Sequence, residues 1–151
     1  MKKFYTRITL LLFSLILGVS SFAFAAEKDD AMAMVKSAVA YYKANGMEKT
    51  LESLNDSKGQ FIKGSLYVFA YDLNGTMMSN VVKPDLVGQN VIDVPDVTGK
   101  IYRREIIEIA VKTGSGWVDY KTMHPKTKSI EQKTTYFEKI EDLVIGCGIY
   151  K

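Results

Sequence analysis

Near Gly64 the apolar residues of this chain change from a helical spacing to the alternation of β-strands. Before that point they recur at steps of three to five residues from Val35 to Leu54, which indicates an amphipathic helix. Asp29 and Asp30 suit the start of this helix, because carboxylates favour the free N–H groups of a first turn. The Asn-Gly pair at 45–46 predicts a kink or a junction of two helices.

Beyond Gly64, five segments carry the alternating, aromatic and β-branched residues of strands: 66–71, 76–79, 116–121, 133–140 and 143–150. The Asn-Gly pair at 74–75 predicts a tight hairpin between the first two, since both residues tolerate positive φ. Residues 81–100 read as a long loop with short helical turns. Residues 102–112 form a second predicted helix, with one apolar face at Ile106, Ile107, Ala110 and Val111. This order predicts an α+β domain with helices on an antiparallel sheet of about five strands.

The N-terminus has the three parts of an export signal. Basic residues lie between Lys2 and Arg7, an apolar run covers 8–17, and Ala23-Phe24-Ala25 places small residues where a signal peptidase cleaves. We therefore expect a signal peptide over 1–25 and a mature domain over 26–151, located in the periplasm or secreted. The alternative is an uncleaved inner-membrane anchor, since 8–26 is just long enough to span a bilayer.

The excess of basic residues, 20 Lys and Arg against 17 Asp and Glu, lies in the predicted signal. Residues 1–25 contain three basic residues and no acidic one, so the rest of the chain is balanced. We therefore expect no nucleic-acid partner, which would require clustered basic residues. Cys147 is the single cysteine, so an internal disulfide is excluded and a small buried core residue is the expected role.

Little in the sequence favours an enzyme or a cofactor. One histidine and one cysteine lie in different segments, whereas acid–base or nucleophilic catalysis needs a base within reach of a nucleophile. No His, Cys and carboxylate spacing fits a metal site. The run from Asp72 to Gly75 is similar to the opening of a calcium loop, but Lys83 stands where that loop needs glutamate.

Six motifs then occur in one order: YDLNG at 71–75, PDLVGQN at 84–90, DVTGK at 96–100, 114–120 with GWVDY, 125–136, and GCGIY at 146–150. In this order they resemble the single Cache domains, PAS-like extracytoplasmic sensor modules of bacterial chemoreceptors and histidine kinases. The resemblance implies a long N-terminal helix packed on a central antiparallel sheet. It also implies a ligand pocket between the sheet and the loop before the second helix, and a homodimer contact along the long helix.

Similar members bind small carboxylates such as pyruvate, lactate, acetate or propionate. We therefore expect a protein that senses or delivers a small organic acid, with a membrane receptor, a histidine kinase or a transporter as its partner in signal transduction. Because no output module follows Lys151, a free periplasmic protein is favoured over a receptor. The alternative is a structural or interaction module that keeps the scaffold without a functional pocket.

A small carboxylate needs a cation and hydroxyl donors around an apolar floor. Lys133 is the candidate cation, because the resemblance implies that its K-x-x-Y motif faces the pocket; a solvated lysine is the alternative. The candidate donors and contacts are Tyr67, Tyr71, Tyr120, Tyr136, Trp117 and His124. Each tyrosine could instead be plain core, and His124 an exposed turn residue before Pro125. Strand parity puts Tyr67 and Tyr71 on one face, and Trp117 on the face opposite Tyr120.

Overall fold

The computed structural model describes the backbone of residues 2–151 and the side chains of residues 22–151. In the part of the chain that it describes, no helix has both the length and the apolar character that crossing a membrane requires. The predicted signal, 1–25, lies largely outside the described side chains, and its cleavage stays a prediction.

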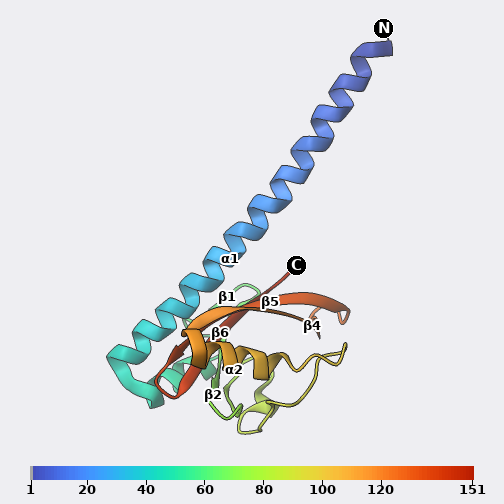
Figure 1. The fold of residues 1–151 in the computed structure, drawn as a ribbon. Coiled ribbons are helices and arrows are strands. Elements are labelled where there is room, and N and C mark those ends of the chain that lie inside the picture. The colour runs from blue at the N-terminus through green and yellow to red at the C-terminus, as the bar shows by residue number, and fades with distance from the viewer. Residues whose placement is uncertain (1) are drawn as a thin grey trace.

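The long first helix, α1 (Lys2–Asn55), begins well before the predicted start at Asp29, so that prediction was wrong. The helix continues through Gly18 from the apolar N-terminal run into the amphipathic segment. The predicted kink is confirmed at Gly46, whose φ of 80° and ψ of 177° are not helical. Thr50 Oγ1 donates to the Gly46 carbonyl at 2.7 Å, which ties the second part of the helix to the kink. Figure 1 shows α1 extending beyond the sheet at its N-terminal end.

The strands form one antiparallel sheet of six in the order β1-β2-β6-β5-β4, with β3 paired to β2. All five predicted strands are present: β2 (Leu66–Asp72), β3 (Met77–Ser79), β4 (Ser115–Met123), β5 (Ile130–Ile140) and β6 (Leu143–Tyr150). The short β1 (Ile62–Lys63) is additional. The last strand lies between β2 and β5, so the two halves of the domain meet at β6 (Figure 1).

The hairpin between β2 and β3 turns at Gly75, whose φ is 87°, as the Asn-Gly pair predicted. Asp72 Oδ1 accepts the N–H groups of Asn74 at 2.9 Å and Thr76 at 2.7 Å, so one carboxylate holds the turn. The loop that follows contains a short 3-10 helix, η1 (Pro84–Leu86), as expected from its composition.

The two faces of the sheet are covered by different elements. One face packs against α1 through a core that includes Val35, Val68, Ile145 and Cys147, each with no exposed surface. Cys147 is therefore a core residue, and burial raises the pKa of its thiol to about 12. The opposite face packs against α2 and the loop before it.

The second helix, α2 (Tyr102–Thr113), ends at Gly114, which is left-handed with φ of 85°. Ile106, Ile107 and Ala110 are buried against the sheet as predicted. Val111 was assigned to the same face and is 58% exposed, so that assignment was wrong. The residue that completes the buried face is Arg103, since positions 103, 106, 107 and 110 have the spacing of one helical face.

Candidate functional site

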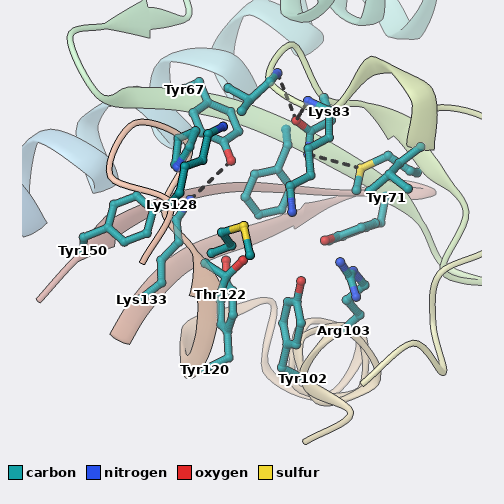
Figure 2. Close-up of a pocket in the computed structure, with 17 residues that line it drawn as sticks. Tyr67, Tyr71, Lys83, Tyr102, Arg103, Tyr120, Thr122, Lys128, Lys133 and Tyr150 are labelled. Atoms are coloured by element: carbon teal, nitrogen blue, oxygen red, sulfur yellow. Dashed lines mark hydrogen bonds between the residues drawn. The ribbon is translucent and has the colours of Figure 1, made fainter. Parts of the chain in front are cut away.

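The face of the sheet that packs against α2 is hollow beside the first turn of that helix. A partly open cavity of about 240 Å³ is lined there by β2, β3, β4, β5, the end of β6, α2 and the two loops after β3 and β4. It is smaller than the pockets that hold drug-sized ligands, so it suits a small molecule. Figure 2 shows side chains from these separate elements converging on it.

Lys133, on β5, contributes a buried cation to this cavity. Its side chain is 2% exposed, and Nζ donates to the Tyr67 hydroxyl at 3.3 Å. The same nitrogen lies 4.8 Å from the centre of the Tyr67 ring and 4.7 Å from that of Tyr150. Burial lowers the pKa of Lys133, since a charged amine loses hydration there. The aromatic faces offset part of that loss, because their negative quadrupoles attract a cation.

Gly148 on β6 gives the Lys133 side chain its room. A Cβ at this position would lie 2.4 Å from Lys133 Cε and 2.6 Å from Thr135 Oγ1. The glycine is therefore required by close approach of a neighbouring side chain rather than by its backbone conformation.

Tyr67, Tyr71 and Tyr120 all line the cavity, together with Phe69 between the first two. Burial raises the pKa of Tyr67 and of Tyr71 to about 12, so both hydroxyls stay protonated donors. The Tyr120 hydroxyl lies 3.1 Å from Thr135 Oγ1, and its ring stacks on Tyr102 with centroids 3.8 Å apart. Burial likewise raises the pKa of Tyr120.

Arg103 is a cavity residue that the sequence interpretation missed. Its side chain, 7% exposed, donates from Nη1 to the Val94 carbonyl at 3.1 Å, and the guanidinium carbon lies 4.4 Å from the Tyr102 ring centre. Among the described side chains, Arg103 Nε is the buried polar atom that has no hydrogen-bond partner. The helical spacing of 103 with 106, 107 and 110 was the signal that could have found it.

The charge of the cavity is entirely positive. Besides Lys133 and Arg103, the exposed Lys83 and Lys128 line it, whereas no Asp or Glu does among the described residues. Partial burial is the main cause that lowers the pKa of Lys83, and the positive charges of Arg103 and Lys133 lower it further. The acidic partners of the described ion pairs lie elsewhere, as with Asp119, which pairs with Lys151 at 2.7 Å.

Trp117 and Tyr136 lie on the other face of the sheet and do not line the cavity. Lys133 and Tyr136 are three residues apart on one strand, so their side chains point to opposite faces. Tyr136 donates to Glu138 at 2.7 Å, and Trp117 packs 5.3 Å from the Tyr136 ring with Lys28 Nζ over its own ring at 4.5 Å. Parity counted from Lys133 along β5 separates Tyr136 from the cavity, and parity counted from Tyr120 along β4 separates Trp117.

His124 lies in the turn between β4 and β5 and is half-buried, not fully exposed. Its Nδ1 accepts the N–H groups of Lys126 and Thr127, each at 3.2 Å, so it holds the turn. Its ring lies 4.4 Å from that of Tyr150. The residue lines a second, mainly apolar cavity of about 310 Å³ instead of the cationic one, although Tyr67 and Tyr150 border both.

Nothing in the described residues groups three or more His, Cys, Asp or Glu side chains where they could hold a metal ion. The cavity itself presents two buried cations and several phenol donors around an aromatic floor, in which Phe69 packs between Tyr67 and Tyr71. Such a set complements a small anion, because charge-assisted hydrogen bonds are the strongest available in a buried site.

Comparison with known proteins identifies the family of the domain. The Cache domain family model matches residues 29–151. The chain is similar to the periplasmic sensor domain of a chemotaxis protein, at 25% identity and a TM-score of 0.64, covering 83% of this chain and 90% of that one. It is also similar to a methyl-accepting chemotaxis protein from Vibrio parahaemolyticus, at 25% identity and a TM-score of 0.71, covering 84% and 90%.

A third structure shares the fold at 21% identity and a TM-score of 0.69, covering 84% of this chain and 95% of that one. It is described as a Cache chemosensory domain that recognises a carboxylic acid. The family match extends over most of the sequence, and the helix-on-sheet architecture agrees with it. The chain belongs to the Cache domain family.

Proposed function

We propose that this protein binds a small carboxylate in the cavity beside α2 and acts as an extracytoplasmic sensor or accessory protein. The observation that carries the proposal is a small cavity lined by Lys133, Arg103 and tyrosine hydroxyls, with no acidic side chain among the described lining residues. The carboxylic acid bound by the similar Cache chemosensory domain supports the same ligand class.

Lys133 and Tyr67 form the carboxylate subsite of this proposal. The ammonium is held between two aromatic rings, so its position is set before the ligand arrives. A carboxylate there gains a charge-assisted hydrogen bond and supplies the counter-charge that the buried amine lacks. Trp117 and Tyr136 have no part in it, and His124 acts only by holding the neighbouring turn.

The location and partners are further parts of the proposal. Two similar chains come from chemotaxis proteins, one of them a periplasmic sensor domain, which supports export and a signalling role. We infer cleavage after Ala25, with a receptor, a histidine kinase or a transporter as the partner and α1 as the contact in a homodimer. N-terminal sequencing of the exported protein tests the cleavage; an intact Met1 would instead favour the anchored form.

The competing function is a scaffold that keeps the fold and binds only a partner protein. A filled interior would support it, whereas this interior holds a cavity with a buried lysine and unpaired guanidinium nitrogen. Two buried cations without acidic partners are costly in a purely structural role, since a buried charge normally requires compensation.

A thermal-unfolding screen of the purified full-length chain against acetate, propionate, pyruvate, lactate and succinate tests the proposal. An acid at 100 times its Kd should raise the free energy of unfolding by about 2.7 kcal/mol. The Lys133→Met variant should lose this rise. Lys121→Met, which removes an exposed lysine of β4, is the matched control and should keep it. If no carboxylate stabilises the wild type, or Lys133→Met is stabilised equally, the proposal is wrong.

A further inference from the structure

The cationic cavity has two separate positive ends, and this inference rests on the proposed function of the same cavity. Figure 2 shows Lys133 with Tyr67 and Tyr150 on one side, and Arg103 with Tyr71 and Tyr102 on the other. The two groups come from different elements: Lys133 from β5, and Arg103 from the first turn of α2.

The Lys133 end supplies the cation and the hydroxyl donor that one carboxylate needs. Its nitrogen donates to the Tyr67 hydroxyl at 3.3 Å and lies 4.7 Å from the centre of the Tyr150 ring. An ammonium has three donors, so the amine still has a donor for an anion.

The Arg103 end has unused donors of its own. Nη1 donates to the Val94 carbonyl, whereas Nε is buried without a partner. In Figure 2 the Arg103 guanidinium and the hydroxyls of Tyr71 and Tyr102 point toward one another. Lys83, whose pKa is lowered partly by the charge of Arg103, adds a second cation to the lining. A guanidinium presents donors in a planar fork that fits a carboxylate.

Between the two ends the floor is apolar. Tyr67, Phe69 and Tyr71 share one face of β2, and the Phe69 ring centre lies 6.4 Å from that of Tyr67 and 5.3 Å from that of Tyr71. Side chains two residues apart on a strand are spaced by about 6.6 Å, so Phe69 separates the two polar ends. An occupant that satisfies both ends therefore carries an anionic group at each end and a short apolar middle.

We propose that the ligand of this cavity is a short-chain dicarboxylate, with one carboxylate at Lys133 and Tyr67 and the other at Arg103, Tyr71 and Tyr102. A monocarboxylate would leave one end, with a buried guanidinium nitrogen, uncompensated. Leaving a charged group unpaired in a buried site costs more than a neutral hydrogen bond contributes.

Isothermal titration of the full-length chain with succinate and with butyrate tests the second carboxylate directly, since the two probes share a four-carbon chain. Succinate should bind at least about tenfold more tightly, the amount expected for one added charge-assisted contact. Arg103→Gln should reduce this ratio to less than about threefold. Arg104→Gln is the matched control, because Arg104 is the next residue on α2 and pairs with Asp93 on the surface.

Lys83→Gln provides a second variant at the same end, should Arg103→Gln fail to fold, and it should lower the succinate-to-butyrate ratio as well. If butyrate or a shorter monocarboxylate binds as tightly as succinate, the dicarboxylate assignment is overturned while the proposed carboxylate function stands. An unchanged ratio in both cavity variants also overturns it. Failure of every carboxylate to bind overturns both.

Discussion

The two faces of the sheet, which are built from the same strands, differ in what covers them and in whether they hold a cavity. The face toward α1 is filled by apolar side chains, with Val35, Ile145 and Cys147 fully buried. The face toward α2 holds a cavity and two buried cations, Lys133 and Arg103. Because side chains alternate along each strand, one sequence of residues supports both faces. Both faces carry an apolar core, but the cationic cavity lies only on the side of α2.

The largest effect should come from emptying the filled face. Ile145→Ala removes a fully buried side chain from β6, where close packing leaves no room for collapse, and should lower the free energy of unfolding by about 3–5 kcal/mol. Met77→Ala, at the cavity, should cost less, about 2 kcal/mol, because the space it leaves joins an existing hollow. Chemical denaturation measures both, and equal losses would remove the distinction between the faces.

The next effect comes from filling the space beside Lys133. Gly148→Ala would place a methyl group against Lys133 Cε, so the side chain must move. We expect the free energy of unfolding to fall by about 1–3 kcal/mol, together with loss of the stabilisation by carboxylates. Thermal unfolding with and without ligand measures both quantities. Unchanged stabilisation by ligand would show that the position of Lys133 is not critical.

Removing the buried charge of Lys133 should raise the free energy of unfolding, whereas the changes above lower it. In the absence of ligand, Lys133→Met should raise the free energy of unfolding by about 1 kcal/mol, since replacing buried charge with an apolar side chain of similar size is often stabilising. The same substitution at the exposed Lys121 should change it by less than about 0.5 kcal/mol. A large loss of stability in Lys133→Met would instead show that the lysine supports the fold.

The smallest effect concerns pH. Burial lowers the folded-state pKa of Lys133 below the ordinary lysine value of 10.5. Between those two pKa values the unfolded chain holds more protons at this position, so the free energy of unfolding rises with pH there, by at most about 1.4 kcal/mol per unit. Tyr67 and Tyr71, whose pKa is raised to about 12, oppose this rise only above pH 10.

Denaturant unfolding at a series of pH values below 10 should therefore give a steeper rise for the wild type than for Lys133→Met. Burial lowers the pKa of Lys83 in both proteins, but the part of the lowering that comes from the charge of Lys133 is absent from the variant, which adds to the difference in the same direction. Parallel slopes would indicate that Lys133 keeps an ordinary pKa in the folded protein.

Local patterns predicted the elements well because they depend on neighbouring residues. The alternation of 66–71 and 143–150, the hairpin at Gly75 and the kink at Gly46 all follow from short stretches of chain. The alternation of side chains along β2 also predicted that Tyr67 and Tyr71 lie on the same face of the sheet. The same rule, applied from Lys133 to Tyr136, removes Tyr136 from the candidate site.

The cavity depended on contacts that no local pattern contains. Arg103 was missed because a charged residue at the start of a helix is ordinarily solvated, and only the packing of α2 on the sheet buries it beside Tyr71 and Tyr102. His124 was assigned to the site by type, whereas the β4–β5 turn directs it to the neighbouring cavity.

By itself, the sequence determined the order of the two helices and of strands β2 to β6, the two faces of each strand, the glycines at the turns and the family resemblance of six ordered motifs. The tertiary structure alone decided that β6 lies between β2 and β5, that Gly148 makes room for Lys133, and that Arg103 meets the far end of the same cavity. The reason is physical: periodicity depends on residues a few positions apart. A cavity between two buried cations depends on the packing of segments that are distant along the chain.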